Sequence, residues 1–68
     1  MMLTIDARVQ VTCTENDQVA PGTIVRIQGN RVDVMLDRGG GAIVIGMVMQ
    51  KPGLYVGRRS GLEFTMRT

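Results

Sequence analysis

The chain has 68 residues, a formal net charge of +2 at pH 7, one cysteine and no histidine. A lone cysteine excludes an internal disulfide, and the lack of histidine excludes Cys/His metal centres and Ser-His or Cys-His nucleophile pairs. A domain of this size buries only about 60% of its extended-chain surface, so its core is marginal without partners. We therefore expect residues 1–68 to form one domain, without metal or cofactor, that is stabilised as a homo-oligomer.

The sequence carries no sign of export or of membrane insertion. Residues 1–6 lack the basic and apolar regions of a signal peptide, and the longest apolar run, residues 42–49, is far shorter than a membrane span. The unpaired Cys13 suits a reducing compartment. These features predict a cytoplasmic protein without a membrane partner.

Apolar and polar residues alternate from residue 2 to residue 14, which is typical of a strand with one buried face. We predict a long or bent first strand here, followed by a polar turn at residues 15–18. Its buried face is expected to hold the residues at odd positions, which are Leu3, Ile5, Ala7, Val9, Val11 and Cys13.

Residues 22–37 have the pattern of a β-hairpin, because two alternating runs flank the dipeptide Gly29-Asn30. Such dipeptides favour the positive φ angles of a two-residue primed turn. A two-residue loop predicts four cross-strand pairs, which are Gln28–Arg31, Ile27–Val32, Arg26–Asp33 and Val25–Val34.

This register assigns the side chains of the hairpin to two faces. The inner face is predicted to hold Val32, Val34 and Leu36 against Thr23, Val25 and Ile27. The outer face is predicted to carry an Arg26–Asp33 ion pair and a contact between Ile24 and Met35.

Residues 43–49 are apolar on both faces of the expected strand, and Gly46 within them suggests a bulge or a sharp bend. A strand without a polar face is covered on both sides. In so small a chain a second subunit is one source of that cover, and an ordinary central strand with an apolar outer face is the alternative. The candidate interface residues are Ile24, Met35, Ile43, Ile45, Met47 and Met49.

The remaining turn and strand signals complete an all-β pattern. We interpret residues 39–41, three glycines, as a flexible hairpin tip, since the lysine and helix of a phosphate-binding loop do not follow. Pro52-Gly53 predicts a type II turn, residues 57–61 a loop, and Leu62, Phe64 and Met66 the buried face of the last strand. Five or six short strands predict a small closed or nearly closed antiparallel barrel.

Charge is distributed unevenly along the chain. Residues 1–37 hold three arginines and five carboxylates, a net −2, whereas residues 38–68 hold five basic residues and one carboxylate, a net +4. The pair Arg58-Arg59 between glycines suits phosphate recognition, although a merely solubilising loop has the same composition. The candidate ligands for a phosphate are Arg58, Arg59, Lys51, Arg38 and Arg67. We expect no enzyme, because no catalytic constellation is present.

The hairpin of residues 22–36, the apolar strand after it and the closing Gly61-Leu62-Glu63-Phe64 resemble the body of a PilZ domain over residues 8–66. That resemblance implies a six-stranded barrel. The family binds cyclic di-GMP through Arg-x-x-x-Arg and Asp/Asn-x-Ser-x-x-Gly motifs. Here Arg8 stands alone and residues 26–29 lack the Asp and Ser, so the resemblance implies a shortened member with a regulatory, protein-binding role.

Residues 22–24, residues 31–37 and Gly46-Met47 are also similar to small OB-fold initiation factors and S1-type domains, which implies RNA binding. SH3-, Tudor- and Sm-like barrels remain open as well. Two functions are therefore carried forward. The first is a self-associating adaptor that works through protein contacts, and the alternative binds nucleic acid or a nucleotide through the basic second half.

Overall fold

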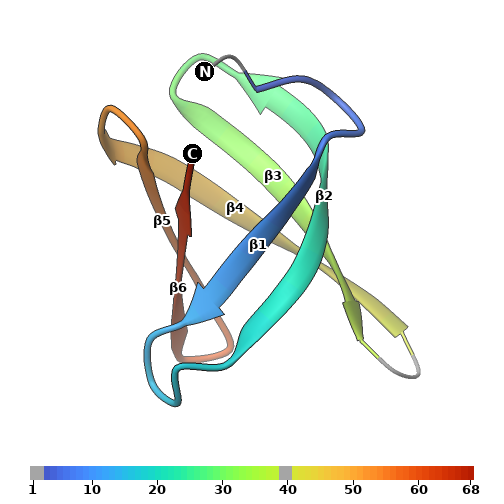
Figure 1. The fold of residues 1–68 in the computed structure, drawn as a ribbon, viewed down its shortest axis with the longest axis vertical. Helices are drawn as coiled ribbons and strands as arrows, with labels where there is room; N and C mark the ends of the chain where they lie inside the picture. The colour runs from blue at the N-terminus through green and yellow to red at the C-terminus, as the bar shows by residue number, and fades with distance from the viewer. Residues whose placement is uncertain (1–2, 39–40) are drawn as a thin grey trace.

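The computed structural model describes residues 3–38 and 41–68, with only the backbone described at residues 37 and 38. Each strand pairs antiparallel with the next along the chain, and the last pairs with the first, which closes a barrel (Figure 1). The prediction of an all-β antiparallel barrel is thus confirmed. The six strands are β1 (Arg8–Cys13), β2 (Val19–Gln28), β3 (Arg31–Arg38), β4 (Gly41–Lys51), β5 (Leu54–Arg59) and β6 (Leu62–Arg67).

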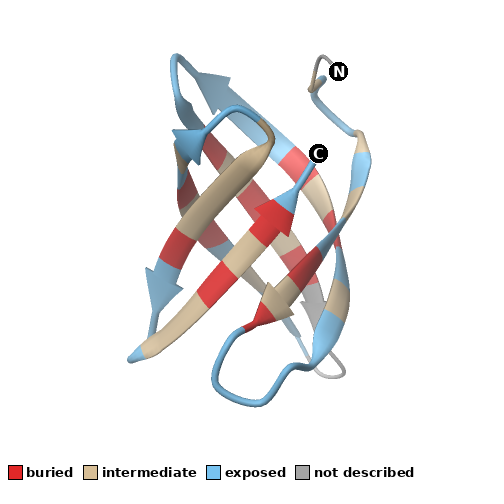
Figure 2. Ribbon diagram, turned by 60° about the vertical axis from the view of Figure 1, so that its left-hand side comes forward, coloured by how far each residue is buried: buried red, intermediate tan, exposed pale blue. Residues whose placement is uncertain are grey.

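The inward-facing side chains of five strands form one apolar core. Burial alternates along the strands, as a closed barrel with a filled interior requires (Figure 2). Among the described residues no polar side chain is buried. The core consists of Val11, Cys13, Ile24, Val32, Val34, Leu36, Ile45, Met47, Phe64 and Met66.

The first strand is shorter than the alternation predicts. It begins at Arg8, because a turn precedes it in which Ala7 donates its amide to the carbonyl oxygen of Thr4 at 3.2 Å. Within this turn Asp6 has a φ of 69°, and Ile5 is 51% exposed. The prediction that Ile5 lies on the buried face is therefore wrong, whereas Val11 and Cys13 lie in the core as predicted.

The β2–β3 hairpin has the predicted register near its turn and a different one further along. Gln28 pairs with Arg31, Ile27 with Val32 and Arg26 with Asp33, and only Gly29 of the two turn residues has a positive φ, 59°. A bulge then shifts the register. Beyond it, three pairs continue the ladder, Ile24–Val34, Thr23–Met35 and Gly22–Leu36. Val25 has no partner in this register.

The bulge reverses the facing of the residues that precede it. Ile24 turns into the core, and Val25 is 39% exposed on the outside. The predicted pairing of Val25 with Val34 and the predicted outer contact between Ile24 and Met35 are both wrong. A bulge places two residues opposite one, so every residue beyond it changes face relative to a regular ladder.

The outer face of the hairpin also carries a different ion pair from the predicted one. Nε of Arg31 lies 3.3 Å from Oδ1 of Asp33, and no described ion pair joins Arg26 to that carboxylate. The Arg31 guanidinium lies over Gly46, which pairs with Asp33 in a regular part of β4. The predicted bulge at Gly46 is thus absent from the β3–β4 ladder. The missing side chain of this glycine makes room for the arginine.

The predicted loop at residues 57–61 is mostly strand. β5 continues through Arg59, and Ser60 and Gly61, with φ of 55° and 78°, make a two-residue turn. The turn at Pro52-Gly53 has the positive φ expected at Gly53, 86°. Of the predicted glycine tip, residues 39 and 40 lie outside the described residues, and Gly41 begins β4.

Candidate binding groove

Three of the six predicted interface residues are unavailable to a partner. Ile24, Ile45 and Met47 are at most 1% exposed inside the barrel, so their assignment to an interface is wrong. The barrel interior covers the inner face of β4 and leaves the outer face of this strand exposed, so it does not supply the second cover for which the sequence names another subunit as one source. The other three candidates are half-buried, and they are Met35, Ile43 and Met49.

The outer face of β4 presents other residues instead. Val44 and Val48 point away from the core and are each 45% exposed. Gly46 lies between them under the Arg31 side chain. The two valines therefore flank a charged group rather than form one continuous apolar patch.

The predicted phosphate ligands are divided between the two ends of the barrel. Arg58 and Arg59 lie next to the β5–β6 turn, whereas Arg67 pairs with Leu54 at the other end of the same ladder. Lys51 pairs with Leu54 from the opposite side. Four residues of strand, about 13 Å, separate the two levels, so the five residues do not form one site. Arg38 ends β3, and its side chain is not described.

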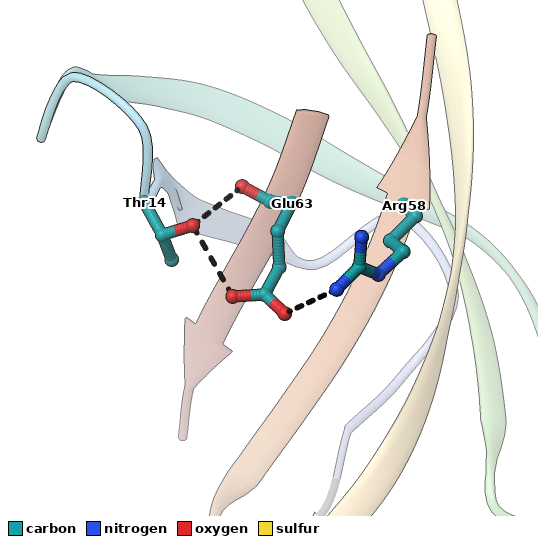
Figure 3. A network of polar contacts seen from close by, with 3 residues as sticks. All are labelled: Thr14, Arg58 and Glu63. Atoms are coloured by element: carbon teal, nitrogen blue, oxygen red, sulfur yellow. Dashed lines mark hydrogen bonds and ion pairs between the residues drawn. The ribbon is translucent and has the colours of Figure 1, made fainter. Parts of the chain in front are cut away.

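Arg58 is engaged in a polar network that joins β5, β6 and the turn that follows β1 (Figure 3). Its Nη2 lies 3.4 Å from Oε2 of Glu63, and the other carboxylate oxygen lies 3.2 Å from Oγ1 of Thr14. The Thr14 amide also donates to the Glu63 carbonyl oxygen at 2.9 Å. Because the Thr14 hydroxyl has one proton, it bonds either the carboxylate or that carbonyl, at 3.3 Å, at any moment.

Arg59 likewise has a partner within the barrel. Its Nη1 donates to the carbonyl oxygen of Val44 at 3.2 Å. Both arginines of the Arg58-Arg59 pair therefore contribute to joining neighbouring strands, and this favours a structural role for them over ligand binding.

The ladder between β1 and β6 is short and covers only one end of the seam between these strands. It pairs Val11 with Met66, Thr12 with Thr65 and Cys13 with Phe64. Beyond Met66 the chain stays with β5, since Arg67 pairs with Leu54 and the Thr68 amide donates to Gly53 at 3.0 Å. In Figure 1 the start of β1 and the C-terminal end of β6 accordingly lie apart, as the arms of a V.

A groove of about 550 Å³ occupies the open end of this seam. Arg8 from β1 and Arg67 from β6 are its charged residues, and none of the lining side chains is acidic. A second hollow of about 410 Å³, lined by Gln10, Thr12, Thr65 and Arg67, continues it along the outside of the two strands. We call the larger hollow the seam groove; its lining is Leu3, Ala7, Arg8, Val9, Gln10, Pro21, Arg67 and Thr68.

The arginines of the seam groove have no described carboxylate partner. The ion pairs between described side chains are Arg31–Asp33 and Arg58–Glu63, and both Arg8 and Arg67 are exposed. Leu54 of β5 pairs with Arg67 on one side and with Lys51 of β4 on the other, so Lys51 adds a third positive charge nearby. The groove thus combines an apolar lining with positive charge at its rim.

Only Arg67 of this pair was among the candidate phosphate ligands. The alternation of β1 puts Arg8 on its outer face, but no local signal shows which strand lies beside it. The pairing of β1 with β6 joins segments more than 50 residues apart in the chain, and this information is absent from the local pattern.

No group of three or more His, Cys, Asp or Glu side chains comes together within residues 3–38 and 41–68. The same part of the chain contains no helix of the length and apolarity needed to cross a membrane.

Comparison of the chain with protein-family models, with curated proteins and with solved structures finds no match. The resemblances to PilZ domains and to small OB-fold proteins therefore stay predictions.

Proposed function

We propose that this chain is a non-catalytic binding module and that an anionic ligand binds in the seam groove. The observation that carries the proposal is the pair Arg8 and Arg67, which lie on two different strands, line one groove and lack a described carboxylate partner. A ligand bound there would contact both β1 and β6, the neighbouring strands that share the shortest ladder. Such a site suits an adaptor.

The chemistry of the groove supports an anionic ligand of small or moderate size. Guanidinium groups bind carboxylate and phosphate oxygens through paired, charge-assisted hydrogen bonds. Leu3, Val9 and Pro21 supply an apolar surface beside them. The volume of about 550 Å³ lies within the range of ligand sites, about 300–1,000 Å³.

The proposal is tested by measuring the affinity for inorganic pyrophosphate by calorimetry at low salt. The Arg8→Glu and Arg67→Glu variants should each bind at least about tenfold more weakly, since each replaces an attractive charge by a repulsive one. Arg26→Glu is the matched control, because Arg26 is exposed on β2 and does not line the groove. Equal affinities in all three variants would reject the seam groove as the site.

A second candidate function is self-association over the outer face of β4. It is favoured by the exposure of Val44 and Val48, 45% each, on two outward positions of one strand that flank Gly46. Light scattering at tens of micromolar should then give a mass above that of one chain, and Val48→Glu should lower it. A monomeric mass for the native chain would reject this candidate and leave the seam groove unaffected.

A further inference from the structure

The N-terminal half of β1 offers an unpaired backbone edge to the seam groove. The registered pairs of β1 with β6 begin at Val11, so Arg8, Val9 and Gln10 pair with β2 alone among the described strands. An exposed strand edge is a template for a further strand, because its amide and carbonyl groups need hydrogen-bond partners.

The direction of the backbone groups follows from two hydrogen bonds at the other end of the strand. Cys13 donates its amide toward the β2 side, to the Gln18 carbonyl oxygen at 2.8 Å, and Thr14 donates to Glu63 on the β6 side. Successive peptide groups of a strand alternate between its two edges. The amide and carbonyl groups of Arg8 and Gln10 are therefore directed toward the seam. Gln10 lies next to the last registered pair with β6, Val11–Met66, so Arg8 is the residue of β1 that stands clear of the β1–β6 ladder.

The side chains along this edge alternate between the outer face of the barrel and the face of the core. Arg8 and Gln10 lie on the outer face with Thr12, whereas Val9 lies on the same face as the core residue Val11. A strand added beside β1 would place alternate side chains next to Arg8 and Arg67, and its other side chains next to Val9 and Leu3. Acidic residues suit the first set and apolar residues the second.

We propose that the seam groove takes an extended acidic peptide segment, which pairs with Arg8 at the start of β1 as an added strand. This inference rests on the proposed function and names the class of its ligand. Main-chain hydrogen bonds to the β1 edge supply affinity, and the two arginines select carboxylates at alternate positions. Every described strand pair of the barrel is antiparallel, and we assign the same orientation to the added strand.

A single-stranded nucleic acid fits the groove less well. Binding of this kind uses aromatic side chains on which bases stack, and the chain has one tyrosine, one phenylalanine and no tryptophan. Phe64 is buried, Tyr55 packs against the core, and neither lines the groove. A nucleic acid also lacks the peptide backbone that would pair with the β1 edge as a strand.

The proposal is tested with the capped peptide acetyl-Val-Glu-Val-Glu-Val-amide, its Lys-for-Glu counterpart and two backbone-methylated forms. In an antiparallel added strand, residues that face outward beside Arg8 direct their amides to β1. Methylation of the Glu amides should therefore weaken binding at least about tenfold, and methylation of the central Val amide much less. The Lys peptide should not bind, and Arg8→Glu should lose affinity for the acidic peptide where Arg26→Glu does not.

Hydrogen exchange of the free and bound protein supplies a second readout. The amide of Arg8 should become protected when the acidic peptide binds. Equal binding of the parent and both methylated peptides, or tighter binding of a short single-stranded DNA, would overturn the added strand. The added strand would also be overturned if the peptide failed to bind while pyrophosphate still bound in an Arg8-dependent way. That result would leave the proposed anion site intact. Failure of both ligands would reject the strand and the proposed function together.

Discussion

The Arg31 side chain lies across Gly46, so that a Cβ atom on this glycine would collide with the guanidinium group. A second glycine in contact with the first is crowded in another way. A Cβ atom on Gly57 would lie 2.5 Å from the carbonyl oxygen of Gly46 and 3.0 Å from side-chain atoms of Ile45 and Met47. At Gly46 a new Cβ atom would meet a surface side chain that can move away. At Gly57 it would meet backbone and core side chains that cannot.

Gly57→Ala should therefore destabilise the barrel much more than Gly46→Ala. We expect Gly57→Ala to lower the free energy of unfolding by about 1–3 kcal/mol, because β4 and β5 must move apart. For Gly46→Ala we expect a change within about 1 kcal/mol, since Arg31 can swing into solvent and an exposed ion pair contributes little. Urea denaturation of both variants measures the difference, and equal midpoints would contradict this account of the two glycines.

The facing of β4 predicts opposite outcomes for two neighbouring substitutions. Met47→Glu places a carboxylate in the core, at a cost of several kcal/mol, which is comparable with the whole stability of a small domain, about 5 kcal/mol. We expect an unfolded chain by circular dichroism. Val48→Glu, on the exposed face, should keep the native spectrum. A folded Met47→Glu variant would mean that β4 has the other face inward.

The network around Glu63 should contribute modestly to stability. The side chains of Arg58 and Glu63 are 74% and 33% exposed, and surface ion pairs contribute about 0–1 kcal/mol. A double-mutant cycle with Arg58→Ala and Glu63→Gln should give a coupling within that range that decreases with added salt. A coupling well above it would assign the pair a larger share in closing the barrel.

The β5–β6 turn can be improved by one substitution. Ser60 and Gly61 both have positive φ, as in a type I′ turn, and asparagine tolerates that conformation better than serine does. Ser60→Asn should raise the free energy of unfolding by a few tenths of a kcal/mol, about 0.5. Ser60→Val is the opposite control and should lower it, because a β-branched residue is strained there. If both variants had the same unfolding midpoint, the turn would be of another type.

The parts of the fold that depend on local sequence were predictable. Gly29-Asn30 and the alternation beside it determine a tight hairpin, and the three residue pairs nearest the turn are confirmed. The register fails at Val25, because Ile24 and Val25 are adjacent apolar residues and either can face the core. The choice between them is made by a bulge that depends on packing against Val34.

The groove was less predictable than the barrel for a related reason. Strand β4 is apolar on both faces, a pattern that suits an oligomer or an ordinary central strand with an apolar outer face. The barrel covers Ile45 and Met47 on the inner face of this strand, and Val48 on its outer face is exposed. The seam depends on where β6 leaves β1, and this follows from the pairing of Arg67 with Leu54. No pattern within β1 indicates that Arg8 faces a groove.

The most direct test of the anion site is a map of amide chemical-shift changes in the native protein on addition of pyrophosphate. The account predicts that the largest changes fall at Arg8–Gln10 and at Arg67–Thr68, on the two sides of the seam groove. Changes centred on Arg58 and Arg59, at the other end of the β5–β6 ladder, or no changes at all, would contradict it.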